Sequence, residues 1–311
     1  MKNLSERYEK YSDGCYKITC RKFEELFELL NINYDIRYKN FFRGHSKSEE
    51  FKLISSIDRE YLKHAIELAK SDYSISRDGF IAQHLNNFRK KIRGKVDSED
   101  YFKDEIKAWS LGQHYGLYTP YLDWTESPYI AAFFATIEYP ESDGCIYILN
   151  FKYINEMNQK ADTNKKLIDF IDNPECKNYK LQIIEPMTNF ITRLNAQNGS
   201  FTKTPDGIPI DDWINCFPEY KNEMILIKVI IPKKLKPVIM YFLNQANINY
   251  STIYPDLTGI CKFCNLNLQH TEQLNEAEVK FYTKMHKIAK NFLNEIGEYN
   301  KNDIKKDGAK K

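Results

Sequence analysis

Apolar residues recur along the chain in two patterns, which predict strands and helices respectively. Short runs of β-branched and other apolar residues at 144–151 and 224–231 predict strands, and the second run, the most hydrophobic of the chain, is expected inside the sheet. Helical spacing of apolar residues predicts amphipathic helices over 23–30 and 273–297. Because these elements alternate without a regular βαβ rhythm, we expect an α+β fold, a single domain with a mixed or antiparallel sheet flanked by helices and a C-terminal helical extension.

The stretch 109–135 has a loop-and-strand pattern before Asp123 and a helical pattern after Ser127-Pro128. Pro128 suits a first helical position, where no backbone donor is lost, and Ser127 before it can cap the following amides. The nearly all-apolar residues 130–135 then predict a buried helix. Asp123, Thr125 and Ser127 would thus lie at a strand end beside a helix N-terminus, where unpaired amides can hold an anion or a ribose. A capped helix start without any ligand explains the same residues equally well.

Composition narrows the class of protein without assigning a function. The chain has 311 residues, with 45 Lys+Arg against 43 Asp+Glu, so its net charge of +2 does not by itself require a nucleic-acid partner. It has seven cysteines, no N-terminal stretch resembling a signal peptide and no apolar run of membrane-spanning length. We therefore predict a cytoplasmic protein with reduced thiols and no membrane partner. Cys261 and Cys264 form a single CxxC pair, so we expect no metal site.

Three charged features each leave two interpretations open. Arg43 follows two bulky apolar residues, and a half-buried arginine needs an anionic partner, either a ligand or an internal carboxylate. The basic run 89–95 fits a solvated helix end or a nucleic-acid contact, although it lacks the interleaved aromatics of single-strand binders. His114 is a candidate proton carrier or a packed side chain.

Several blocks of residues together resemble the FRG domain, a family named for its Phe-Arg-Gly motif. They are Phe42-Arg43-Gly44, Gln113-His114-Tyr115-Gly116-Leu117, Leu122-Asp123-Trp124-Thr125-x-Ser127-Pro128, Phe134-Ala135, Ala196-Gln197-x-Gly199-x-Phe201 and Tyr254-Pro255-Asp256-Leu257-x-Gly259. The resemblance implies a helical lead-in over 1–37, an FRG domain over 38–265, and an amphipathic helix with a basic tail over 266–311. Two positions depart from the family pattern: Ser55 stands where a Pro is common, and Pro120 stands where an Arg is common, which removes a positive charge.

The FRG pattern is in turn similar to that of ADP-ribosyltransferases, which implies an ADP-ribosyltransferase-like core and NAD as a substrate. That resemblance makes Arg43, Gly44, Tyr115, Thr125 and Ser127 the expected cofactor-binding residues, with Arg43 neutralising a phosphate and Ser127 holding a ribose.

The expected catalytic residues are Asp123 and Gln197. Gln197 stands in the block where the enzymes carry a Glu, and it supplies no carboxylate to stabilise a ribosyl cation. Asp123 or Glu185 would have to substitute, and the sequence does not choose between them.

Two hypotheses follow from the resemblance. In the first, the protein is an NAD-consuming ADP-ribosyltransferase or NAD hydrolase, a bacterial or phage-conflict effector with a protein or nucleic-acid acceptor. In the second, it is a non-catalytic nucleotide- or nucleic-acid-binding module on the same scaffold. The order of Arg43, Ser127 and the helix favours the first hypothesis, and the missing carboxylate at Gln197 favours the second.

Overall fold

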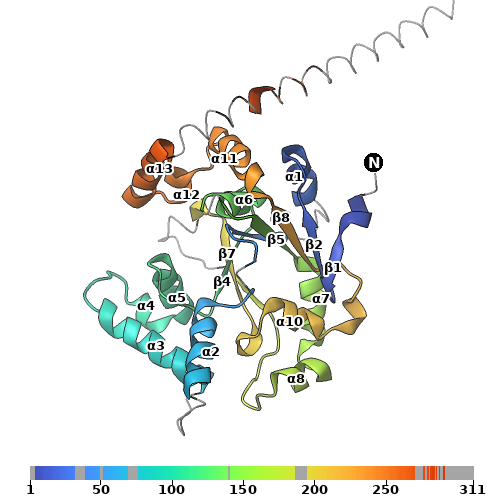
Figure 1. The fold of residues 1–311 in the computed structure, drawn as a ribbon. Helices are drawn as coiled ribbons and strands as arrows, with labels where there is room; N and C mark the ends of the chain where they lie inside the picture. Colours follow the sequence, from blue (N-terminus) through green and yellow to red (C-terminus); the bar gives the residue numbers. More distant parts are fainter. Residues whose placement is uncertain are drawn as a thin grey trace, which may run out of the picture.

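A computed structural model describes residues 4–31, 39–49, 52–68, 76–138, 141–185 and 195–269, and scattered helical positions between 276 and 290. Within this part of the chain, eight strands form one sheet in the order β1-β2-β8-β5-β3-β4-β7-β6 (Figure 1). Their bounds are β1 Glu9–Ser12, β2 Cys15–Thr19, β3 Asn40–His45, β4 Leu122–Thr125, β5 Gly144–Asn150, β6 Gln182–Ile184, β7 Gly199–Lys203 and β8 Leu226–Ile231. β2 and β8 are parallel and the remaining pairs are antiparallel, so the predicted mixed sheet is confirmed.

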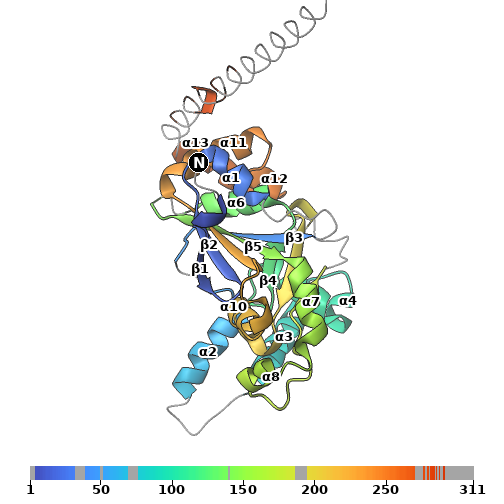
Figure 2. The same cartoon turned by 90° about the vertical axis from the view of Figure 1, so that its right-hand side faces the viewer.

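Helices cover both faces of the sheet (Figure 2). One face carries α1 (Phe23–Leu30), α6 (Pro128–Thr136), α11 (Lys236–Gln245), α12 (Tyr250–Ile253) and α13 (Leu257–Gln269). The other face carries α7 (Phe151–Ala161), α8 (Lys165–Ile171) and α10 (Ile210–Asn215). A third group, α2 (Ser56–Leu68), α3 (Arg77–Ile92), α4 (Asp100–Lys103) and α5 (Glu105–His114), lies beside β4 and β7. The predicted α+β fold, with a mixed sheet flanked by helices, is therefore confirmed.

Each helix group encloses its own cluster of buried apolar side chains. One cluster joins α1, α6, α11 and α12 to the sheet, a second joins α7, α8 and α10 to the opposite face, and a smaller one joins α2, α3 and α5 to β7. Short 3-10 turns connect several of these elements: η1 Leu4–Arg7, η2 Pro205–Gly207, η3 Pro218–Tyr220 and η4 Lys233–Leu235.

The helix α6 lies unusually close to the sheet because glycines face it. A Cβ added to Gly44 on β3 would lie 1.9 Å from the carbonyl oxygen of Ala131, and one added to Gly144 on β5 would lie 2.1 Å from that of Ala135. A side chain at either position would push the helix away from the strands. The glycine of the Phe-Arg-Gly motif thus has a visible packing function, on the face of the sheet opposite to Arg43.

The structure extends the sheet beyond what the sequence pattern indicates. Strands β1 and β2 fall within the predicted helical lead-in 1–37, which also contains α1. The segment 204–221, for which no helix was expected, contains α10, whose fully buried Trp213 donates from Nε1 to the carbonyl of Tyr179 at 2.9 Å. The predicted boundaries between lead-in, FRG domain and C-terminal helix stay predictions. Of the helix expected over 273–297, most residues lie outside the described part, although Phe281 packs on Phe23 and Phe242.

None of the described helices combines the length and the apolar character needed to cross a membrane.

Candidate functional site

Arg43 joins the end of β3 to β4. β3 pairs with β5 along its whole length but with β4 at the single position Phe42↔Thr125. Beside that position the Nη1 of Arg43 donates to the carbonyl of Asp123 at 2.5 Å and lies 3.7 Å from the Asp123 carboxylate. Burial lowers the pKa of Arg43, and Asp123 opposes this shift, so the guanidinium stays charged at neutral pH. The structure thus brings together the predicted phosphate-binding arginine and a predicted catalytic carboxylate.

The Asp123 carboxylate is exposed and yet held in one orientation. Its side chain is 62% exposed, and its Oδ1 accepts a hydrogen bond from Nε2 of Gln113 in α5. Gln113 in turn accepts from the hydroxyl of Thr119 at 2.5 Å, and the Thr119 amide donates to Ser56 at the start of α2 at 3.0 Å. Because these bonds fix the amide of Gln113, the carboxylate is both accessible to a ligand and preorganised.

His45 serves as a neutral acceptor next to Arg43. Its Nε2 accepts from Nε of Arg43 at 3.0 Å. Burial lowers the pKa of His45 to about 2, and the nearby charges of Arg43, Arg59 and Lys228 lower it further in the same direction. The imidazole therefore adds no charge to this part of the site at neutral pH.

Two more cations, Arg59 and Lys228, lie near Arg43, and neither was among the predicted site residues. Arg43, Tyr147 and Lys228 occupy one register across the neighbouring strands β3, β5 and β8. The Nζ of Lys228 lies 5.6 Å from the centre of the Tyr147 ring and donates to the carbonyl of Ser48. Arg59 of α2 donates from Nη1 to the carbonyl of Ile54 at 2.6 Å. We call Arg43, Arg59 and Lys228 the cationic cluster; all three are half-buried.

A second group of predicted site residues surrounds the start of α6. The Thr125 hydroxyl donates to the backbone carbonyl of Gln197 at 2.7 Å and accepts from the amide of Ser127 at 3.0 Å. Ser127 accepts from the amide of Ile130 at 3.4 Å as the helix cap, and the Gln197 side chain donates to the carbonyl of Ile253 at 3.3 Å. These contacts fix the end of β4 to the loop before β7. Their predicted roles in ligand binding and catalysis stay predictions.

The remaining predicted residues lie in different surroundings. Tyr115 follows α5 and is 78% exposed, with its ring edge-on to that of His114 at 4.7 Å. Glu185, the alternative carboxylate, lies 3.6 Å from Nζ of Lys39, which also binds Glu126 at 2.8 Å. Of the two carboxylates that the sequence left open, Asp123 is therefore the one that the structure places against Arg43.

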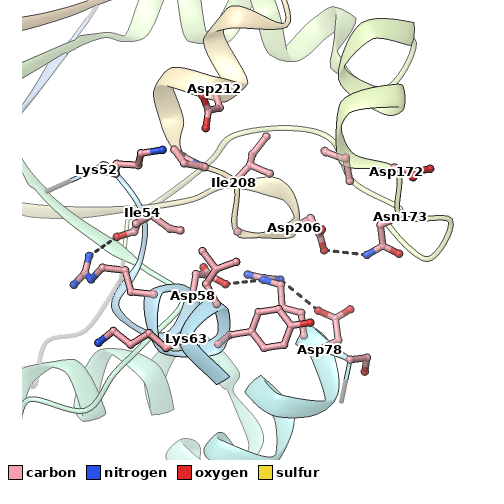
Figure 3. Close-up of a pocket in the computed structure, with 18 of the residues that line it drawn as sticks. Lys52, Ile54, Asp58, Lys63, Asp78, Asp172, Asn173, Asp206, Ile208 and Asp212 are labelled. Carbon is pink, nitrogen blue, oxygen red and sulfur yellow. Dashed lines mark hydrogen bonds and ion pairs between the residues drawn. The ribbon is translucent and has the colours of Figure 1, made fainter. Parts of the chain in front are cut away.

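A pocket of about 840 Å³ opens next to the cationic cluster (Figure 3). Arg59 contributes to its wall, and the wall continues over α2, the start of α3, and the segments 171–175 and 206–209. Nε of Arg77 donates to the buried carboxylate of Asp58 at 2.6 Å, and Gly207, with φ +70°, packs directly on this ion pair. Asn173 donates to Asp206 at 2.9 Å on the opposite wall. In the sequence, the Pro205-Asp206-Gly207 turn is the one local signal of this pocket, and it was not enough to predict the pocket.

Comparison with known proteins gives one finding. The family model of the FRG domain matches residues 38–144, which contain Arg43, Asp123 and Ser127. The chain is thus an FRG domain-containing protein, and Phe42-Arg43-Gly44 is its Phe-Arg-Gly motif. No curated protein and no solved structure matches the chain. The similarity to ADP-ribosyltransferases accordingly stays a prediction.

Proposed function

We propose that the Arg43–Asp123 site binds NAD and that the Asp123 carboxylate promotes cleavage of the nicotinamide–ribose bond. The observation that carries this proposal is the pairing of an exposed, Gln113-oriented carboxylate with a half-buried arginine. Nε and Nη1 of Arg43 are engaged, whereas its Nη2 has no hydrogen-bond partner within the described residues. That nitrogen is suited to bind an anionic group of a ligand.

The chemistry requires a negative charge beside the ribose. As the bond to nicotinamide breaks, positive charge develops on the sugar, and a fixed carboxylate stabilises that charge more than it stabilises the ground state. In the free protein Arg43 partly offsets the charge of Asp123, at 3.7 Å. A bound phosphate would neutralise Arg43 and so leave the carboxylate to act on the ribose.

Other residues would position the ligand. Thr125 and Ser127 anchor the end of β4 to the start of α6, so they would keep the Asp123 backbone in place. The exposed ring of Tyr115, two residues after Gln113, offers a flat surface on which a base or the nicotinamide ring could stack. In this proposal the acceptor of the ADP-ribosyl group is water, a protein or a nucleic acid.

A non-catalytic nucleotide- or nucleic-acid-binding module is the second candidate. The observation that favours it is the side chain of Gln197, which donates to the carbonyl of Ile253 and brings no carboxylate to the site. The basic end of α3 would then be the nucleic-acid contact, since Lys90 and Lys91 are exposed there.

Release of nicotinamide from NAD tests the proposal. We expect Asp123→Asn to lower the rate by at least about a hundredfold, because it keeps the shape of the side chain and removes its charge. The matched control is Asp97→Asn, an exposed aspartate outside the site, which should keep the wild-type rate. The assay is run with and without cell lysate as a source of acceptors. If wild type releases no nicotinamide in either condition yet binds RNA or DNA with a steep salt dependence, the second candidate is correct.

A further inference from the structure

We infer that the cationic cluster binds a diphosphate, which lies between Arg43 and Lys228, with Arg59 as a third contact. This inference deepens the proposed function, on which its placement beside Asp123 rests. It names the class of ligand, a phosphoanhydride such as the diphosphate of a dinucleotide, and it assigns two binding residues, Arg59 and Lys228, that lie on different elements from Arg43.

The register of the sheet places the two outer cations on either side of one ring. Arg43 pairs with Tyr147, and Tyr147 pairs with Lys228, so all three side chains leave the same face of the sheet. Neighbouring strands lie about 4.8 Å apart, so the two cations start roughly 10 Å apart, with the aromatic ring between them. The Lys228 ammonium is 5.6 Å from the ring centre, and the His45 ring is edge-on at 5.8 Å. Cations on both sides of a ring suit an anion with two phosphate groups better than one with a single phosphate.

The charges of the cluster are poorly balanced by the protein itself. Within the described residues its one ion pair is that of Arg43 with Asp123, whose carboxylate is mostly exposed. Arg59 and Lys228 donate to backbone carbonyls, which carry no net charge. The carboxyl group of Asp211 in α10 also interacts with Tyr147, but burial raises the pKa of this carboxyl group and so favours its neutral form. Half-buried cations without carboxylate partners favour an anionic ligand.

The cluster also explains why His45 is useful as a neutral residue. Its Nε2 accepts a hydrogen bond from Nε of Arg43 and so directs the guanidinium along β3 toward β4. A protonated imidazole would instead repel Arg43 and Arg59. In this arrangement Arg43, Arg59 and Lys228 carry the positive charge of the cluster, and the imidazole adds none.

Binding titrations test the inference with pyrophosphate, ADP-ribose and nicotinamide riboside as probes. We expect Lys228→Met and Arg59→Gln each to weaken binding of pyrophosphate and ADP-ribose about tenfold or more, since each removes a charge-assisted contact. Binding of nicotinamide riboside, a pyridinium cation without a phosphate group, should not weaken in either variant. Wild-type affinity for pyrophosphate should fall with rising salt. Thermal melts identify any variant that fails to fold.

The control is Lys17→Met. Lys17 is the next residue in the same register, on β2, and it pairs with Glu9 at 3.1 Å. It should leave binding of both phosphate ligands unchanged, because its charge is already compensated. The inference is overturned if wild type does not bind pyrophosphate at millimolar concentration, or if Lys17→Met weakens binding as much as Lys228→Met.

The two proposals fail separately. If phosphate ligands bind in a Lys228-dependent manner but NAD is not cleaved, the inference stands and the catalytic proposal is wrong. If NAD is cleaved while Lys228→Met leaves both pyrophosphate binding and the KM for NAD unchanged, the inference is wrong and the catalytic proposal stands.

Discussion

Substituting Gly44 by alanine tests whether the motif glycine is needed for packing or for binding. The new Cβ would lie 1.9 Å from the carbonyl oxygen of Ala131 and 2.8 Å from the amide nitrogen of Ala135. An ordinary contact begins near 3.4 Å, so α6 and β3 must separate by about 1.5 Å. Both obstructing atoms belong to the helix backbone, so no change of side-chain rotamer relieves the clash. We expect a loss of about 3 kcal/mol or more in the free energy of unfolding, at the upper end of overpacking costs.

Urea denaturation measures this loss, and a thermal melt should show a fall in Tm of about 4 °C or more. The control is Gly94→Ala, where nothing lies within 4 Å of the added Cβ and the cost is confined to the positive φ of +71°, about 1 kcal/mol. The reasoning is refuted if Gly44→Ala is no less stable than Gly94→Ala. A stable Gly44→Ala protein that no longer binds NAD would instead show that the predicted binding function of Gly44 is correct.

Three further substitutions test other parts of the account. Arg43→Ala should lower the free energy of unfolding by about 1–3 kcal/mol, because the carbonyl of Asp123 on β4 loses its donor. The same substitution should abolish nucleotide binding. If the variant is as stable in urea as wild type, the arginine has no structural role. The pKa of His45 is about 2 in the folded protein and 6.5 in the unfolded chain. The free energy of unfolding of wild type should therefore fall by up to about 1.4 kcal/mol per pH unit as the pH falls below 6.5. Urea titrations of His45→Asn should show a flatter dependence on pH, and equal profiles for the two proteins would contradict the low pKa of His45. Arg77→Met should lower the free energy of unfolding by about 3–5 kcal/mol in the same assay, because it leaves the buried carboxylate of Asp58 without its ion-pair partner. Lys103→Met, which breaks an exposed ion pair, should lower it by less than about 0.5 kcal/mol. Similar losses for the two variants would show that burial of the ion pair does not matter here.

The sequence predicted best those elements that local chemistry determines. The cap and proline at Ser127-Pro128 defined the start of α6, and the apolar run that follows indicated its burial correctly. The β-branched run of β5 was equally informative. By contrast, β1 and β2 are short and rich in polar residues. β2 joins the sheet by pairing in parallel with β8, more than 200 residues later in the chain, and no local pattern encodes such a pairing.

The candidate site was predictable only as far as the family motifs extend. The motifs supplied Arg43 and Asp123, and the structure places them in contact. They did not supply Tyr147 or Lys228, because the register of β3, β5 and β8 is a property of the folded sheet. One signal was present in the sequence: Lys228 is the single charged residue within its most hydrophobic run. A lysine within such an apolar strand indicates that apolar side chains do not fully cover the sheet at that position.

The choice between two carboxylates also needed the structure. Asp123 and Glu185 each lie near the end of a predicted strand, so the sequence pattern could not decide which carboxylate faces Arg43. In the structure Glu185 belongs to the ion pairs of Lys39, whereas Asp123 is oriented by Gln113 from a helix that the strand pattern alone does not position.

A crystal structure with ADP-ribose or NAD bound would test the central claim most directly. We predict that the diphosphate lies within hydrogen-bond distance of Nη2 of Arg43 and Nζ of Lys228, and that the ribose on the nicotinamide side contacts the Asp123 carboxylate. Ligand density confined to the pocket between α2, α3 and the 206–209 segment, with no contact to Asp123, would contradict the proposed site.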